Sequence, residues 1–361
     1  MPESMTTPSQ FTLPALGPTF PTFSSLEALR ACLAELGARA PHERRVLRAW
    51  LGKLNWDEAQ ESRRLKLPRR LGEALPRIRE ALQGIACIRS RHPGADPESE
   101  RLLITLADRQ TIESVLLPRQ GVCVSTQMGC AVGCVFCMTG RGGLVRQLSD
   151  IEIAAQAAIA RELRPDTKKV VFMGMGEPSH NLSNVFRAVE FLAEFGDFGH
   201  KDLVISSVGD ERLFEKLFGS KVRPALALSL HSADDEKRRR LLPKGARMTV
   251  ARIIERGEAW ARLTGYPVQY EWTLMKGVND SFDEIDRLAE LLKGKYAMVN
   301  FIPVNAVEGS PWVRPERAHA VELVRRLRAQ GVVATLRDSA AQDVDGGCGQ
   351  LRARVLRGEE Q

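Results

Sequence analysis

The sequence predicts an α/β protein, a partial (β/α) barrel of TIM type preceded by a small helical domain. From residue 169 onward, short apolar segments of strand length alternate strictly with amphipathic segments of helix length. Such alternation is typical of parallel βαβ units. Residues 26–88 show helical spacing instead, as in the series Leu26, Leu29, Leu33. With 361 residues and 43% hydrophobic content, the chain can bury one barrel-sized core and a smaller attachment.

The barrel elements are predicted one by one from this pattern. The expected strands are 169–173, 203–207, 225–230, 268–274, 298–304 and 332–337. The expected helices start at 183 or span 211–218, 250–263, 282–292 and 315–330. An earlier helix is expected from the capping box Ser149-Asp150-Ile151-Glu152 to about Leu163. About six such units give an incomplete barrel, with its chemistry at the carboxyl ends of the strands.

The chain divides into five predicted segments. Residues 1–23 carry five prolines and many Ser and Thr, so we expect a disordered tail. Residues 24–90 form a basic helical accessory domain with breaks at 37–41, Pro68 and Pro76. Residues 91–124 are expected to hold a β-hairpin linker with strands at 102–106 and 114–117. Residues 125–351 are expected to form the barrel with its C-terminal cysteine segment, and residues 352–361 a tail.

The charge of the chain favours a polyanionic partner. The formal net charge is +7 and the pI is near 9.2, and residues 43–80 hold eleven basic residues against six acidic ones. We expect the region 44–79 to contact RNA, although solvated helical faces have the same composition. Further arginines that could contact phosphate are Arg141, Arg146, Arg238, Arg239 and Arg240.

The sequence contains neither a membrane span nor an export signal. No run of about 18 uncharged apolar residues occurs, and the start lacks a basic and then apolar leader. We therefore expect a soluble, cytoplasmic protein without a membrane partner. The odd number of cysteines, seven, argues for reduced thiols rather than a disulfide framework.

Four of the seven cysteines lie within the fifteen residues 123–137. The spacing of Cys130, Cys134 and Cys137 places three thiolates on one compact loop. Three ligands on a [4Fe-4S] cluster leave one iron open to an external molecule. A zinc site usually needs four Cys or His ligands, and no second pair is nearby. From spacing alone the cluster is favoured, and a zinc site or unrelated thiols stay open.

The motif Cys-x3-Cys-x2-Cys, with Phe136 before its last cysteine, resembles the signature of radical S-adenosylmethionine (radical SAM) enzymes. The wider motifs, CVSTQMGC at residues 123–130 and DGGCGQL at 345–351, resemble the RlmN/Cfr family of RNA adenine methyltransferases. The resemblance covers about residues 111–351. It implies a [4Fe-4S] cluster held by the three cysteines, S-adenosyl-L-methionine, and methylation of an adenine carbon, C2 rather than C8, in 23S ribosomal RNA or transfer RNA. It further implies a reductase or flavodoxin-type electron donor, and we expect a monomer.

The same resemblance implies three catalytic residues. By its place in CGQL, Cys348 is the carrier of the methyl group, as S-methylcysteine. Cys123 matches the resolving cysteine, which forms a transient disulfide with Cys348. Glu113 resembles the glutamate that accepts a proton from the base, since a desolvated carboxylate can do so. A solvated glutamate on a hairpin is the competing interpretation.

Cofactor-binding residues are implied at the ends of the predicted strands. The segment GMGEP at 174–178 looks like the one that binds the methionine amino group, and its glycines let the backbone approach a ligand. Matching cofactor contacts follow later strands. The residues so assigned are Gly176, Glu177, Ser207, Ser229, Leu230, His231 and Asn305.

The chain departs from the family pattern near its C-terminal motif. Ala340-Ala341 stand where the family often has an arginine-glycine pair, and Gly346-Gly347 replace alanines. These changes leave the RNA and the base position open. Two rival functions remain: a radical SAM enzyme acting on a small molecule or peptide, for which Cys348 is unnecessary, and a non-enzymatic iron-sulfur protein that binds RNA.

Overall fold

The computed structural model describes residues 22–60, 66–245, 247–307 and 309–352. Its centre is one ten-stranded sheet in the order β1-β2-β3-β4-β7-β8-β9-β10-β11-β12. From β4 onward each strand is parallel to its neighbour, whereas β1 to β4 pair antiparallel. The strands are β1 (Ala86–Pro93), β2 (Glu100–Leu106), β3 (Thr111–Leu117), β4 (Gly121–Cys123), β7 (Lys169–Phe172), β8 (Leu203–Ser207), β9 (Ala225–Ser229), β10 (Val268–Leu274), β11 (Ala297–Pro303) and β12 (Val333–Leu336).

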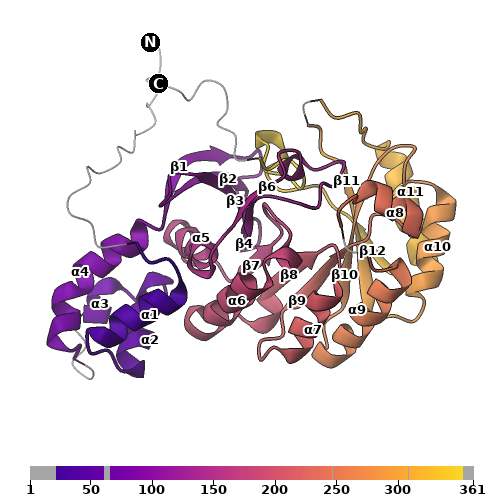
Figure 1. Ribbon diagram of the computed structural model, residues 1–361. Coiled ribbons are helices and arrows are strands. Elements are labelled where there is room, and N and C mark those ends of the chain that lie inside the picture. The colour runs from indigo at the N-terminus through magenta and orange to yellow at the C-terminus, as the bar shows by residue number, and fades with distance from the viewer. Residues whose placement is uncertain (1–21, 61–65, 246, 308, 353–361) are drawn as a thin grey trace, which may run out of the picture.

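Helices connect the parallel strands and cover one face of the curved sheet (Figure 1). Because β1 and β12 end the strand order, the barrel stays open, which confirms the predicted partial (β/α) barrel. The connecting helices are α5 (Asp150–Leu163), α6 (Leu182–Gly196), α7 (Glu211–Gly219), α8 (Asp235–Leu241), α9 (Val250–Thr264), α10 (Phe282–Leu292) and α11 (Arg317–Ala329).

Local sequence explains why these helices begin where they do. The predicted capping box is present at α5, where the Ser149 hydroxyl and the Glu152 carboxylate accept each other's backbone N–H. Thr249 and Ser281 cap α9 and α10 in the same way with their hydroxyls. The strands they alternate with are mainly apolar, and β8 is buried along its whole length, whereas β7 and β12 are buried only in part. Propensity and burial agree here, which is why the predicted and observed bounds match closely.

The N-terminal helices form a group of their own beside α5 and α6 (Figure 1). They are α1 (Leu26–Glu35), α2 (Ala40–Trp50), α3 (Trp56–Gln60) and α4 (Arg69–Gln83). The predicted break at Pro76 is wrong, because α4 continues through it. The proline removes one backbone donor, but the buried Leu71, Leu75 and Ile78 hold that face in place. The helical segment also ends earlier than expected, since β1 begins at Ala86.

The expected hairpin is part of a larger antiparallel sheet. Its two predicted strands are confirmed as β2 and β3, and they are joined by β1 on one side and β4 on the other. The division of the chain at residues 90 and 124 stays a prediction. Most of the two predicted tails, 1–21 and 353–361, lies outside the described residues. Among the described helices, none has both the length and the apolar character needed to cross a membrane.

Candidate active site

The three clustered cysteines lie on the loop that follows β4, between the short strands β5 (Gln127–Gly129) and β6 (Leu144–Gln147). Burial raises the pKa of the Cys134 thiol, and the neighbouring Cys137 and Cys130 raise it further, so the three sulfurs lie near one another. The turn between two of them is closed by the Cys137 N–H, which donates to the Cys134 carbonyl at 3.0 Å. In the described residues no three His, Cys, Asp or Glu side chains converge on one ion. A [4Fe-4S] cluster needs no such convergence, because each thiolate ligates a different iron.

A buried cation stands beside this loop. The Arg238 side chain is 2% exposed, and its guanidinium donates to the carbonyls of Val208 and Ser229. Its Nε atom has no hydrogen-bond partner in the described part of the chain. Burial lowers its pKa to about 10, and the charges of Asp235, Cys134 and Glu177 oppose this shift. An anionic group bound at this loop would satisfy the orphaned donor, so the donor set fits an iron-sulfur cluster with a carboxylate ligand.

The segment GMGEP follows β7 and turns sharply toward the loop. Gly176 has φ of +107°, and a Cβ atom there would lie 2.6 Å from the Gln127 Cβ. The Glu177 N–H donates to Gln127 Oε1 at 2.7 Å, which fixes the carboxylate of Glu177 behind the cysteine loop. That carboxylate is 4% exposed and accepts from the Ser207 hydroxyl at 2.6 Å and from the Val208 N–H at 3.0 Å.

The residues after β9 meet the cysteine loop from the opposite side. The His231 ring packs edge-on against Phe136, with centroids 4.8 Å apart. Its Nδ1 accepts from the Thr273 N–H at 3.0 Å, and burial together with Arg238 lowers the pKa of His231 to about 3. His231 is therefore neutral at pH 7, with its proton on Nε2. Leu230 is fully buried and Ser229 is half-buried, so a ligand could reach Leu230 only through its backbone.

The segment that carries Cys348 is docked onto the same loop. The Met138 N–H donates to the Gly349 carbonyl at 2.7 Å, and a Cβ atom at Gly349 would lie 3.2 Å from the Phe136 carbonyl oxygen. Asn305, which follows β11, donates to the carbonyl of Cys348 at 3.0 Å and to the Ser339 hydroxyl at 2.9 Å. Asn305 therefore holds the segment of Cys348 in place.

Gly347, one of the residues that departs from the family pattern, is required by this packing. A Cβ atom at Gly347 would lie 2.6 Å from Gln350 Oε1 and 2.7 Å from Asn305 Nδ2. Both neighbours belong to the hydrogen bonds that hold the turn, since Gln350 accepts from the Gly347 N–H at 2.8 Å. The glycine is therefore a consequence of how closely the turn approaches Asn305.

Cys123 ends β4 and lies near Cys348. Burial raises the pKa of the Cys123 thiol to about 12, and the charge of Cys348 adds to this. Burial also raises the pKa of Cys348, while the Ser339 hydroxyl lowers it. This burial concerns the surroundings of the sulfur, since the Cys348 residue as a whole keeps an exposed surface. All seven cysteines are free, so the structure holds no disulfide between Cys123 and Cys348.

Glu113 lies on β3, next to the strand β4 that carries Cys123, and its side chain is not solvated. Its side chain is fully buried on β3, and its Oε1 accepts from Arg101 at 2.5 Å. Its Oε2 accepts from the Arg352 N–H at 2.7 Å. The interpretation as a solvated hairpin glutamate is therefore wrong, because the antiparallel sheet covers this side chain and supplies a matching cation.

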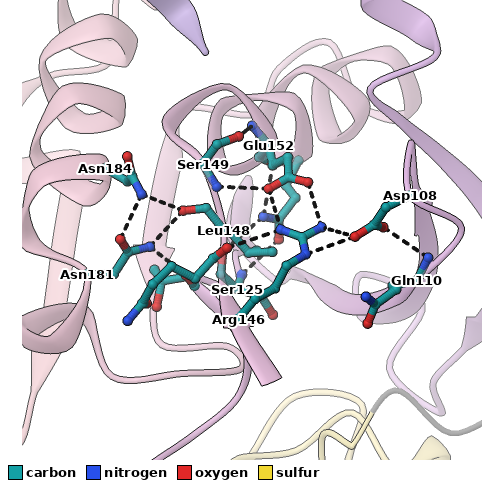
Figure 2. A network of polar contacts seen from close by, with 12 residues as sticks. Asp108, Gln110, Ser125, Arg146, Leu148, Ser149, Glu152, Asn181 and Asn184 are labelled. Carbon is teal, nitrogen blue, oxygen red and sulfur yellow. Dashed lines mark hydrogen bonds and ion pairs between the residues drawn. The ribbon is translucent and has the colours of Figure 1, made fainter. Parts of the chain in front are cut away.

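Two of the arginines that were expected to contact phosphate form contacts within the protein instead. Arg238 is buried beside the cysteine loop. Arg146 forms ion pairs with Glu152 and Asp108, both at 2.8 Å, at the centre of the polar network in Figure 2. Neither is an exposed cation, because tertiary contacts decide which face of a basic segment reaches the solvent.

One acidic residue near Cys348 is not among the predicted site residues. Glu271 on β10 is 5% exposed, accepts from Asn300 Nδ2 at 2.8 Å, and acts electrostatically on Cys348. Burial raises its pKa, which Asn300, Arg337 and Lys169 oppose. The only signal in the sequence is a charged residue inside the otherwise apolar strand 268–274, which in a parallel barrel indicates a polar interior position.

Comparisons with known proteins agree with this geometry. A sequence model of the radical SAM superfamily matches residues 124–292. A probable RNA methyltransferase of Pseudomonas paraeruginosa is 55% identical over 90% of this chain and 93% of its own length. One from Thiobacillus denitrificans is 56% identical over 92% of this chain and 91% of its own length. The crystal structure of a radical SAM methyltransferase from Sphaerobacter thermophilus superimposes with a TM-score of 0.80 at 32% identity, covering 93% of this chain and 100% of that one.

Both the sequence identity and the coverage are high enough to decide the family. These matches cover 90 to 93% of this chain. The chain therefore belongs to the radical SAM superfamily, and within it to the methyltransferase family of these relatives.

Proposed function

We propose that this protein methylates an adenine carbon of RNA, C2 rather than C8, as a member of the RlmN/Cfr family. The relatives named probable RNA methyltransferases support the RNA substrate. The observation that carries the proposal is the hydrogen bond from the Met138 N–H to the Gly349 carbonyl. It holds Cys348 beside Cys137, so that a carbon on the Cys348 sulfur lies near the cysteine loop.

The cofactors implied by the superfamily are a [4Fe-4S] cluster and S-adenosyl-L-methionine. Cys130, Cys134 and Cys137 would hold the cluster. When bound, the two cofactors supply a 5′-deoxyadenosyl radical, which makes an electron-poor adenine carbon open to methylation. The residues proposed to line the S-adenosylmethionine site are Gly176, Glu177, Ser207, Ser229, Leu230, His231 and Asn305. Five of them, Glu177, Ser207, Leu230, His231 and Asn305, are buried, which would limit the access of water to the bound cofactor.

Cys348 and Cys123 have successive roles in this proposal. The methyl group carried on the Cys348 sulfur would lose one hydrogen atom to the 5′-deoxyadenosyl radical, and its carbon would bond to the adenine carbon. That adduct would give up one electron to the cluster and the ring proton to Glu113. The Cys123 sulfur then attacks the Cys348 sulfur, the sulfur–carbon bond breaks with its electron pair on the carbon, a proton completes the methyl group there, and a disulfide joins the two cysteines. Because burial raises the pKa of Cys123 to about 12, Cys123 is a thiol in the resting protein. It must lose its proton during the attack itself.

Glu113 is the proposed proton acceptor, and its surroundings set a condition for this role. Both of its oxygens are hydrogen-bonded, Oε1 by Arg101 and Oε2 by the Arg352 N–H. Proton transfer to Oε2 therefore requires the segment that follows Cys348 to release it. In this way the carboxylate would become available only when the carrier segment moves.

The RNA partner is proposed to be 23S ribosomal RNA or transfer RNA, gripped in part by the basic helices of region 44–79. Two members of that region already serve the fold. Arg45 is buried, and Arg48 pairs at 2.6 Å with Asp197, the residue that caps the C-terminus of α6. The remaining basic residues would supply the sequence-independent attraction to phosphate. A reductase or flavodoxin-type protein is the proposed electron donor.

The substitution Cys348→Ala tests the proposal. With reduced, anaerobically reconstituted protein we expect 5′-deoxyadenosine to form from S-adenosylmethionine while methylated adenosine in the RNA falls below detection by mass spectrometry. Cys32→Ala, a free cysteine in α1, serves as the matched control and should retain methyl transfer. Unchanged methylation in Cys348→Ala would eliminate the carrier role. No 5′-deoxyadenosine from the wild type would favour an iron-sulfur protein that only binds RNA.

A further inference from the structure

A pocket of about 500 Å³ lies beside the cysteine loop and contains four arginines. They are Arg89, Arg109, Arg141 and Arg352. They come from four separate parts of the chain: β1, the turn between β2 and β3, the end of the cysteine loop, and the segment after Cys348. No Asp or Glu lines the pocket among the residues that the structure describes. Its walls therefore carry a concentrated positive charge.

Two of these arginines have no acidic partner of their own. Arg352 pairs with Asp345 at 3.4 Å, and Arg141 donates to the Gly309 carbonyl at 3.3 Å. Arg89 and Arg109 are exposed and form no ion pair with any residue in the described ranges. Asp108, the residue before Arg109, forms its ion pair with Arg146 instead, and Arg146 also pairs with Glu152 (Figure 2).

This polar network also fixes the wall of the pocket. The ion pair between Arg146 and Asp108 ties β6 to the turn between β2 and β3. The Gln110 N–H donates to Asp108 Oδ1 at 3.0 Å, and Arg109 between them has φ of +66°. The turn therefore presents Arg109 in a defined conformation over the pocket.

The floor of the pocket is apolar and adjoins the candidate active site. Met128 and Met175 form part of the lining, and each lies two residues from a site residue, Cys130 and Glu177 respectively. Val145, also in the lining, is 62% exposed. Thioether and aliphatic groups pack against flat aromatic surfaces, and guanidinium groups bind phosphate with two parallel hydrogen bonds. The combination suits a nucleotide, with its phosphate on the arginines and its base against Met138, a third lining methionine, which is half-buried.

We infer that this pocket binds a nucleotide of the RNA strand adjoining the target adenine, with a phosphodiester held by Arg89 and Arg109. The inference rests on the proposed function in taking RNA as the substrate. Single-stranded RNA is recognised through unstacked bases and phosphate contacts, which this pocket offers together. The pocket thus positions the strand while the target base enters the neighbouring site.

Salt-dependent RNA binding tests the inference. The probe is a labelled RNA hairpin with adenines in a single-stranded loop, titrated with full-length protein at several KCl concentrations. The variant is Arg89→Gln combined with Arg109→Gln. We expect binding about tenfold weaker at low salt, and a slope of log K against log salt that is smaller by roughly 0.7 for each phosphate that the variant no longer neutralises. Because both side chains are exposed, the variant should fold normally.

A matched control removes the same charge elsewhere. Arg317→Gln with Arg325→Gln changes two exposed arginines of α11, with side chains 76% and 73% exposed. This control should keep the wild-type slope. A third variant, Arg89→Lys with Arg109→Lys, should keep most of the slope, because the charges remain, yet bind more weakly, because the bidentate geometry is gone.

Equal slopes for the pocket variant and the α11 control would overturn the inference. If the wild type methylates RNA while the pocket variant binds it with an unchanged slope, the pocket assignment fails and the proposed function stands. If the hairpin binding depends on the pocket but no RNA is methylated, the pocket stands as an RNA site and the proposed function fails.

Discussion

Two buried arginines in different regions of the barrel are neutralised in opposite ways. Arg101, at the seam between β2 and the C-terminal segment, is 1% exposed and is matched by the Glu113 carboxylate at 2.5 Å. Arg238, at the barrel mouth, is 2% exposed and contacts two backbone carbonyls but no carboxylate among the described residues. A buried charge is costly unless it is paired. Arg101 is therefore matched by a direct ion pair, although its Nε and Nη2 donors have no hydrogen-bond partner among the described residues. Arg238 has no carboxylate in direct contact within the described ranges, and the charges of Asp235 and Glu177 act on it only from a distance, so an anionic ligand could pair with it directly.

The largest effect is expected from breaking the matched pair. Arg101→Met leaves the Glu113 carboxylate buried without its cation, which should lower the free energy of unfolding by about 3–5 kcal/mol. Urea denaturation measures this. Combining Arg101→Met with Glu113→Leu should recover most of the loss, because both charges are then gone. An equal loss in the double variant would show that the pair is not the cause.

The same double variant separates two roles of Glu113. If Glu113 accepts the proton from the base, the double variant loses methyl transfer although its fold is restored. If Glu113 only anchors the Arg352 N–H, methyl transfer persists. The measurement is methylated adenosine formed per turnover, with 5′-deoxyadenosine formation as the control for an intact cofactor site.

Substitution of Arg238, the arginine with no carboxylate in direct contact among the described residues, should have an intermediate effect, on ligand binding rather than on folding. Arg238→Gln removes a charged donor beside the cysteine loop, and we expect S-adenosylmethionine to bind about 10- to 100-fold more weakly. Equilibrium dialysis on reconstituted protein measures this. Arg239→Gln, the exposed neighbour on α8, is the control and should bind normally. The cofactor-free Arg238→Gln protein should not be destabilised, and unchanged affinity would contradict the assignment.

The smallest effect concerns a third buried charge, the Glu271 carboxylate. Burial raises its pKa above the ordinary value of 4.5, so between the two values the folded protein binds more protons than the unfolded chain. Stability should therefore fall as the pH rises through this interval. Glu271→Gln removes the titrating group and should flatten the dependence, which unfolding measured between pH 4 and 8 would show. An unchanged pH profile in Glu271→Gln would contradict the prediction.

Most of the barrel is predictable from the sequence. The expected strands 203–207 and 268–274 have the same bounds as β8 and β10, because apolar runs of strand length stand between capped helices. The elements that the pattern does not predict include β5, β6 and α8, which have three to seven residues each. They also include β1, whose eight residues are largely polar or half-buried. Such segments bury too little to leave a periodic pattern, so only their contacts define them.

The candidate site also has one part that the sequence predicts and one part that it does not. The order of the motifs along the chain already puts the three clustered cysteines, Glu177, Ser207 and His231 after β strands, and parallel strands bring such ends to one edge. Nothing local distinguishes Arg238 from Arg239, although one is buried beside the loop and the other is exposed. Burial depends on neighbours distant in the chain, so the environment of a charge cannot be inferred from its own segment.

The architecture, the three-cysteine loop and the family resemblance follow from the amino-acid sequence alone, because they depend on local periodicity and spacing. Three features emerge only when the chain is folded: which charges are paired, how the Cys348 segment docks on the cysteine loop, and that four arginines from separate elements share one pocket. Electrostatic free energy depends on distance and burial, and both are fixed by contacts between segments that lie far apart in the chain.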